Sequence, residues 1–472
     1  MTDAVTQPGT ARGAGAAGNG VAGAVEGGLL ELAERVAGAA KAGEELEVYV
    51  SRGVETDVRA YEGAVESLSS AASAGVGIRV VVGGRQGFAY AGTLDESVVA
   101  QTLAEARDNA SFATPDEHVG LAGPDGVAPA SLELWDDEVP GTPSAAKVDL
   151  ALELERRVRG ADPRVRQVAF ADYGDTAAEA AIATSTGIRA TARRTLCSLA
   201  VEAIAGDDAD SQTGVGFSAA RGPGQLDIDK AVADAVDRAT RMLGATKARS
   251  GRCTVVLDPR VTSTLLAVVS SALSGEAVTK GRSFFAGRVG EEVAVPSLVL
   301  VDDPTDARAF GASTHDAEGL ACRRNVLIEG GVLRGFVFDT TAGRRAGAVS
   351  TASAVRGGYA TTPVAGCRAL LLAPGPLGAR EILAEVDEAL YVQSITGVHS
   401  GVNPVSGDFS VGAEGLMVRG GELAEPIREI TIASTLQRML QAVLHVGADV
   451  EWLPGVAAGQ TLAIGDMSLS GA

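Results

Sequence analysis

Apolar residues in the first part of the chain recur at helical spacing in two segments. Segment 29–40, LLELAERVAGAA, has apolar residues at helical spacing. Segment 95–112 shows the same spacing directly after Asp95, which predicts a helix with that aspartate as its N-cap. The segments between these helices are rich in β-branched and aromatic residues. We predict strands at 45–53, 54–63 and 76–94, the last as a hairpin around Gly83-Gly84.

A Pro/Gly/Asp-rich segment, 122–144, separates this region from the next helix. That helix is predicted at 144–160, with Ser144 as its N-cap. A second amphipathic helix is predicted at 227–245. The residues between the two helices favour strands, at 166–174, 179–187, 188–206 and 213–222.

A buried strand, CTVVL at 253–257, opens the second half of the chain. Asp258 is the predicted N-cap of the next helix, and Pro259 fits its first position, where a missing N–H is harmless. We expect this helix to run to about Leu273 and to stop at Gly275. Further strands are predicted at 297–303, 324–339, 367–375, 389–397 and 408–426, followed by a helix over 430–447.

These elements predict an α+β protein with mixed or antiparallel sheets and flanking helices. A length of 472 residues indicates about two to three domains. We place one boundary at 245–251, between an N-terminal domain (28–246) and a β-rich C-terminal domain (252–472). Residues 1–27 are rich in Gly, Ala and Thr and cannot form a packed core, so we expect them to be disordered.

The charge of the chain narrows the classes of partner. With 40 Lys and Arg against 60 Asp and Glu, the net charge is −20. Such a surface repels nucleic-acid phosphates and anionic lipids, so we expect no direct nucleic-acid or membrane binding. The N-terminus does not resemble a secretory signal, and no apolar run reaches about 18 residues. We therefore expect a cytoplasmic protein.

The distribution of cysteine and histidine argues against a metal site within this chain. Four cysteines, at 197, 253, 322 and 367, form no CxxC pair and are expected to be reduced thiols. Four histidines, at 118, 315, 399 and 445, never lie within one helical turn of each other. A helical zinc motif needs two imidazoles on one face with a carboxylate beside them.

Two serine-based alternatives can be considered. Ser144 and Lys147 match S-x-x-K, but the companion motifs of the β-lactamase-like enzymes are absent, and a serine there more often caps a helix. In GVHSGVNPVSGDFS, 397–410, His399 and Ser400 lie near Asp408. Side chains of adjacent residues rarely meet productively, so a network of loop hydrogen bonds is the simpler interpretation.

Several ordered motifs resemble the TldD/PmbA family. They are GEAVTKGRSFFAGRVGEEV (275–293), SLVLVDD (297–303), RRNVLIEGGVLRGFVFDTTAGRRAG (323–347) and a long segment, 401–433, that starts GVNPVSGDFSVGAEG. The likeness extends from about residue 45 to the end of the chain and is strongest after 252. Because the motifs occur in the family's order, the resemblance is specific at family level.

The resemblance also implies which branch of the family this chain is similar to. TldD members carry HExxxH on the helix before the GRxGE loop and a cysteine near the C-terminus, and together these bind zinc. Counted back from 287–291, the His, Glu and His positions fall on Leu266, Ala267 and Ser271, and the cysteine region, 452–460, reads WLPGVAAGQ. No His or Glu occurs anywhere in 261–275. The chain thus looks like the TldE (PmbA)-type subunit, which lacks the zinc motif.

The resemblance implies a non-catalytic subunit of a heterodimeric zinc peptidase that acts on peptides or unfolded proteins. We expect zinc in a TldD-like partner and no cofactor in this chain. Two alternatives stay open: a TldE-like subunit that serves amide hydrolysis in natural-product biosynthesis, and a stand-alone binding or scaffold protein. Candidate residues for a substrate groove are Arg282, His399, Asn403 and Asp408.

Overall fold

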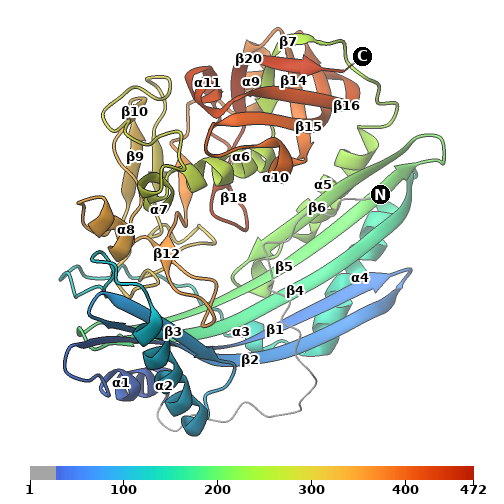
Figure 1. Cartoon of the computed structure of the whole chain (residues 1–472). Helices are drawn as coiled ribbons and strands as arrows, with labels where there is room; N and C mark the ends of the chain where they lie inside the picture. The colour runs from blue at the N-terminus through green and yellow to red at the C-terminus, as the bar shows by residue number, and fades with distance from the viewer. Residues whose placement is uncertain (1–27, 472) are drawn as a thin grey trace.

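The computed structural model describes residues 28–471 and has an α+β architecture (Figure 1). The predicted disordered segment, 1–27, lies outside the described residues. One large sheet is built entirely from strands that precede residue 221, and every other sheet is built after residue 250. The chain passes between these two parts at 245–251, where we propose the domain boundary. No helix in the described residues is long and apolar enough to cross a membrane.

The N-terminal part is a six-stranded antiparallel sheet in the order β3-β2-β1-β4-β5-β6. The two segments predicted at 45–53 and 54–63 form one long strand, because Gly53 continues the ladder between them instead of making a turn. The predicted hairpin at Gly83-Gly84 is confirmed, with positive φ at both glycines. The strands are β1 (Glu44–Tyr61), β2 (Ala64–Val82), β3 (Arg85–Ala91), β4 (Val165–Thr184), β5 (Arg189–Gly206) and β6 (Ser211–Ala220).

Helices cover one face of this sheet, and residues alternate between buried and half-buried along β5, as expected when one face packs against a core. Leu32 and Leu103 enter one apolar cluster, and Leu154 enters a second, next to it along the sheet. Asp95 caps its helix as predicted, by accepting hydrogen bonds from two backbone N–H groups. The helices are α1 (Gly28–Ala37), α2 (Glu96–Phe112), α3 (Glu138–Gly141), α4 (Ser144–Ala161) and α5 (Ile228–Thr240).

A second six-stranded sheet, ordered β16-β15-β14-β7-β20-β17, lies in the C-terminal part. Strands β7 and β14 run parallel, while the other neighbours are antiparallel, so the sheet is mixed. A smaller sheet, ordered β10-β9-β8-β13, lies to one side of it (Figure 1). The larger sheet contains β7 (Gly251–Leu257), β14 (Glu388–Thr396), β15 (Asp408–Arg419), β16 (Glu422–Thr435), β17 (Val443–Val446) and β20 (Leu462–Ser470). The smaller contains β8 (Leu300–Asp302), β9 (Asn325–Glu329), β10 (Val332–Leu333) and β13 (Leu370–Leu372).

Short elements complete the C-terminal part. Two two-stranded ribbons pair β11 with β12 and β18 with β19. The elements are α6 (Pro259–Ala272), α7 (Gly275–Thr279), α8 (Thr340–Arg345), α9 (Ala379–Glu385), α10 (Val398–Gly401), α11 (Leu436–Gln441), β11 (Ala354–Val355), β12 (Val364–Ala365), β18 (Glu451–Trp452) and β19 (Ala458–Gly459).

Several further local predictions were wrong. The two strands predicted at 166–174 and 179–187 form the single strand β4. The helix predicted over 430–447 is the end of β16, the short α11 and β17, because Ile430 and Ile432 alternate with strand period and pair with β15. Gly275 does not end α6; it opens α7, in contact with the Phe338 ring, which a Cβ would approach to 2.2 Å. Ser144 is the first residue of α4 and not its N-cap, since Pro143 occupies that position.

Candidate functional site

Helix α6 starts at a buried junction between the two parts of the protein. Asp258 caps the helix as predicted, by accepting a hydrogen bond from the Arg260 backbone N–H at 3.0 Å. The same carboxylate accepts from Arg238 of α5 at 2.6 Å and from the Tyr391 hydroxyl at 2.7 Å. Because α5 belongs to the N-terminal part, this contact fixes the start of α6 relative to the large sheet.

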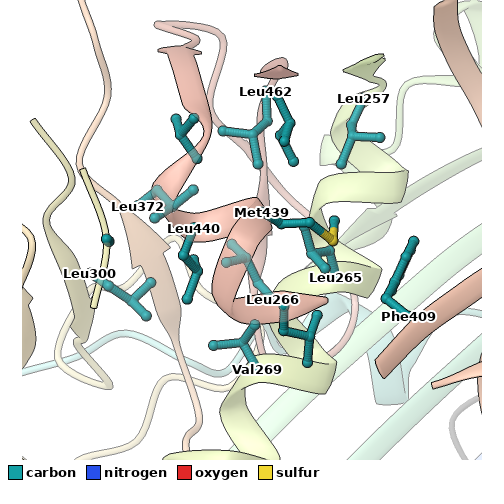
Figure 2. Close-up of a cluster of buried hydrophobic side chains, with 14 of the residues drawn as sticks. Leu257, Leu265, Leu266, Val269, Leu300, Leu372, Phe409, Met439, Leu440 and Leu462 are labelled. Carbon is teal, nitrogen blue, oxygen red and sulfur yellow. The ribbon is translucent and has the colours of Figure 1, made fainter. Parts of the chain in front are cut away.

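The inner face of α6 is an apolar surface. Leu265, Leu266 and Val269 are at most 5% exposed and pack toward Met439, Leu440 and Leu462 (Figure 2). The free space among these side chains is only about 10 Å³, roughly the minimum for a single water molecule. This face therefore has no room for a metal ion with its ligands, and its role is core packing.

The three positions that the resemblance assigns to the zinc motif do not converge. Leu266 points into the apolar core, whereas Ser271 is exposed on another side of the helix. In this chain α6 is a regular helix over both positions, and positions five residues apart on such a helix differ by roughly 140° in direction. The third position, Ala267, is half-buried. The absence of His and Glu from 261–275 holds whichever register is chosen.

A cavity of about 370 Å³ lies at the C-terminal end of α6. Arg282, one of the predicted groove residues, lines it, as does Ser271. Lys280 is ion-paired with Glu276 one helical turn away. The lining consists of Ser270, Ser271, Ser274, Glu276, Ala277, Lys280, Arg282, Ala365, Gly366 and Cys367.

The serine hydroxyls of this cavity are engaged with the backbone. Ser270 donates to the Ala267 carbonyl at 2.7 Å, and Ser271 donates to Val268 at 2.7 Å. Ser274 donates to the Ala365 carbonyl at 2.8 Å. An activated serine needs a general base within hydrogen-bond reach, and these hydroxyls have carbonyl partners instead. The cavity therefore has no serine nucleophile of that kind.

The donor set of the cavity also does not suit zinc. Burial raises the pKa of the Cys367 thiol well above its usual value, which keeps it protonated, while zinc binds the thiolate. Lys280 and Arg282 add positive charge to the same walls. Within residues 28–471, no three His, Cys, Asp or Glu side chains are grouped so that they could hold a metal ion.

The segment that the resemblance aligns with the zinc-ligating cysteine region packs directly on α6. The Ser263 hydroxyl donates to the Ala457 carbonyl at 2.8 Å. Gly459 lies so close to the helix start that a Cβ would be 2.0 Å from the Pro259 carbonyl oxygen. The arrangement of helix and segment is thus present, although the segment contributes no thiol.

The other predicted groove residues lie in the loop before β15. Asn403 accepts hydrogen bonds from the backbone N–H groups of Val405 and Ser406, and Asp408 accepts from the Ser406 hydroxyl at 2.6 Å. His399 is exposed on α10. The loop is a local hydrogen-bond network, and none of the three predicted residues lines the 370 Å³ cavity that contains Arg282.

Sequence reasoning missed the far wall of the cavity. Ala365, Gly366 and Cys367 lie about 90 residues after α6 and reach it through β12, whose Ala365 carbonyl accepts the Ser274 hydroxyl. No spacing or motif in the sequence marks this wall, because it forms only when the chain folds.

Comparison with known families identifies the fold. The PmbA/TldA metallopeptidase domain 1 matches residues 46–110, the central domain matches 137–243, and the C-terminal domain matches 250–471. The chain belongs to the PmbA/TldD metallopeptidase family. The three matches follow one another along the chain in the family's order.

Relatives named for both branches of the PmbA/TldD family show the same percentage identity to this chain. The metalloprotease PmbA of Escherichia coli O157:H7 is 26% identical over 429 residues, with 90% of this chain and 92% of the relative covered. A metalloprotease TldD homolog of Haemophilus influenzae is also 26% identical, over 406 residues, with 83% of each chain covered. Overall identity therefore does not separate the branches.

Solved structures show the same fold. A putative modulator of a DNA gyrase from Thermotoga maritima superposes with a TM-score of 0.85 at 24% identity, covering 93% of this chain and 99% of that one. TldE from Thermococcus kodakarensis gives a TM-score of 0.83 at 22% identity, covering 90% and 97%. Both cover nearly the whole chain, so the likeness includes both parts of the molecule.

Proposed function

We propose that this PmbA/TldD protein is the non-catalytic, TldE-type subunit of a heterodimeric zinc metallopeptidase that acts on peptides or unfolded proteins. In this proposal the zinc and the general base belong to a TldD-like partner in the same cytoplasm. This chain contributes the binding surface that completes the enzyme.

The state of α6 is the observation that carries the proposal. The helix retains its Asp258 cap, its loop and the packed 452–460 segment. Its inner face is filled by Leu266 and its neighbours, and its cavity offers hydroxyls, cations and one carboxylate, Glu276, which is paired with Lys280; it has no imidazole. A preserved frame without catalytic groups supports a role in assembly and substrate binding.

The test reconstitutes the enzyme from its parts. This chain and a TldD-like protein from the same genome are purified separately and assayed on an unfolded peptide substrate, alone and mixed, with and without a chelator. We expect hydrolysis only in the mixture, and we expect it to vanish when the partner's motif glutamate is replaced.

Specific outcomes of this experiment would contradict the proposed function. Hydrolysis by this chain alone, or an equally fast reaction by the partner alone, contradicts a non-catalytic but required subunit. Association is measured by gel filtration of the mixture, since an obligate interface buries upwards of about 2,000 Å². Two separate peaks together with full activity also contradict the proposal.

A further inference from the structure

Arg194 on β5 is a half-buried cation without an anionic partner. Among the described residues, no hydrogen bond and no ion pair involves its guanidinium. This is unexpected in a chain with 60 acidic residues and a net charge of −20. Most other arginines of the large sheet are paired with a carboxylate, as Arg52 and Arg59 are with Glu179 and Asp172 on the neighbouring strand.

The charged groups that act most strongly on Arg194 are two other arginines. Burial and the positive charges of Arg368 and Arg221 lower the pKa of Arg194 to about 10. Arg221 is held by backbone carbonyls, donating to Ala309 at 2.7 Å. Arg368 donates to the Ala354 carbonyl at 3.1 Å. Each neighbour is thus fixed in place by neutral acceptors, and neither supplies Arg194 with a counter-charge.

Buried carboxylates balance only one member of this cluster. The Arg368 charge counteracts the effect of burial on the pKa values of Asp302 and Asp316. No carboxylate is among the main electrostatic neighbours of Arg194, which besides the arginines are Tyr49 and Cys322. An unpaired, partly desolvated cation costs stability, so its presence points to a ligand that supplies the missing charge.

Small residues lie next to Arg194 on the same face of the sheet. Arg194 lies opposite Ala178 of β4, and Ala178 lies opposite Gly53 of β1, so all three are on one sheet face. The next row on that face contains Ser51, Ala180 and Ala192. Arg194 is thus bordered on one side by a floor of small residues, while the row on its other side contains Glu55, Thr176 and Leu196.

The C-terminal part covers one end of this floor. Arg356 stacks over the Tyr49 ring at 4.4 Å, and Arg221 reaches the carbonyl of Ala309. Figure 1 shows the C-terminal part above this face of the large sheet. Arg194 is thus located where the two parts meet.

We propose that Arg194, in the positive electrostatic field of Arg221 and Arg368, binds a carboxylate of the peptide substrate, either its C-terminal carboxylate or an acidic side chain. A guanidinium presents parallel N–H donors that match the two oxygens of a carboxylate. The inference rests on the proposed function, because it names the chemistry by which this subunit recognises a peptide. The small-residue floor gives an extended peptide access to the guanidinium.

The test uses one short peptide sequence in three forms, titrated calorimetrically into the isolated chain and into the reconstituted pair. The first form ends in a free carboxylate, the second is amidated, and the third is amidated but carries one internal Glu. The variants are Arg194→Gln and, as a matched control, Arg193→Gln. Arg193 is adjacent but faces the other side of β5, over the Trp135 ring at 5.5 Å.

We expect the wild-type protein to bind the free-acid peptide at least about tenfold more tightly than the amide, as charge-assisted hydrogen bonds require. Arg194→Gln removes that difference, and Arg193→Gln keeps it. Tight binding of the internal-Glu form assigns the site to acidic side chains, and weak binding assigns it to the peptide terminus. The thermal midpoint of Arg194→Gln should equal or exceed that of wild type, since the variant loses an unpaired charge.

Three results overturn the inference. The first is equal binding of the acid and amide peptides by both the isolated wild-type chain and the reconstituted pair. This result does not bear on the proposed function, which is tested separately by the zinc-dependent activity of the pair. The second is a loss of thermal stability in Arg194→Gln with equal weakening of all peptides, which indicates a structural role. The third is loss of subunit association without loss of carboxylate preference, which assigns Arg194 to a carboxylate of the partner.

Discussion

Arg356 of the C-terminal part donates a hydrogen bond of 2.7 Å to Glu47 on β1 of the large sheet. Glu47 also bonds Arg79 on β2, so one buried carboxylate lies between two guanidinium groups. All three side chains are at most 3% exposed. Burial alone would raise the pKa of Glu47, but the two arginines outweigh it and lower the pKa. Glu47 therefore joins the two parts as a charged group.

Glu47→Gln should destabilise the protein strongly, by about 3–5 kcal/mol, because it removes the carboxylate shared by two buried cations, of which only Arg79 has a second carboxylate nearby, Glu318 at 3.6 Å. Urea denaturation gives the free energy of unfolding. The control is Glu55→Gln, an exposed position on the same strand, which should change it by less than about 0.5 kcal/mol. Equal effects of the two substitutions would show that Glu47 does not hold the parts together.

The raised pKa of the buried Glu318 carboxyl predicts that the stability of the protein depends on pH. Burial raises the pKa of its carboxyl from 4.5 to about 7, against the opposing effect of Arg79 at 3.6 Å. The folded protein thus retains the Glu318 proton at pH values where the unfolded chain has released it. This contribution to stability is complete below pH 4.5 and is lost as the pH rises through about 7.

The measurement compares wild type with Glu318→Gln, which stays neutral at every pH. The free energy of unfolding of wild type should fall relative to that of the variant between pH 4.5 and pH 7, and the difference should level off above this range. Subtracting the variant cancels the other titrating groups. A difference that does not vary with pH would show that Glu318 has an ordinary pKa in the fold.

Local signals in the sequence predicted the start of α6 and the hairpin at Gly83-Gly84, because caps and two-residue turns depend on neighbours in the chain. The helix predicted at 430–447 failed for the opposite reason. Its first residues pair with β15, and that long-range pairing outweighs a helical spacing of Leu and Met further along. Strand pairing of this kind cannot be found from local periodicity.

The candidate site also combines features that local sequence predicts with features that only long-range packing determines. The sequence alone revealed that 261–275 contains no His or Glu, and family resemblance gave that absence its meaning. The sequence could not show that distant side chains such as Met439 and Leu462 fill the space around Leu266, or that Cys367 completes the cavity beside α6. The unpaired state of Arg194 was also hidden, because its neighbours Arg221 and Arg368 are set by the packing of distant segments.

The helix N-caps Asp95 and Asp258 should differ in the free energy of unfolding that is lost when each is replaced by Ala. Asp95 is exposed and bonds only its own helix, so Asp95→Ala should cost about 1 kcal/mol. Asp258 caps α6 and also holds Arg238 and the Tyr391 hydroxyl, so Asp258→Ala should cost about 3–5 kcal/mol. Thermal or urea unfolding compares them directly. Similar losses would mean that Asp258 acts only as a cap.

The composition of the cavity predicts that the isolated chain retains no stoichiometric zinc. Its walls offer serine hydroxyls, two cations, the Glu276 carboxylate paired with Lys280, and a thiol whose pKa is raised well above the usual value. Purified protein is loaded with zinc, dialysed and analysed by mass spectrometry for metal. About one zinc per chain after dialysis would contradict this prediction.

Restoring the zinc motif should not create a peptidase from this chain alone. The variant carries Leu266→His, Ala267→Glu and Ser271→His. Position 266 faces an apolar core with almost no free space, so a histidine there should lower the free energy of unfolding by about 2–5 kcal/mol. The matched control is Ser271→His alone, which should be tolerated because Ser271 is exposed. In α6 as it stands, positions 266 and 271 lie in different surroundings, and the 452–460 segment supplies no thiolate, so the zinc ligand set stays incomplete. Peptide hydrolysis is followed with and without a chelator, and unfolding is followed by circular dichroism. Chelator-sensitive hydrolysis by the isolated triple variant would contradict this prediction. It would show that α6 can still form a catalytic centre and that only the residues at these three positions keep the chain inactive.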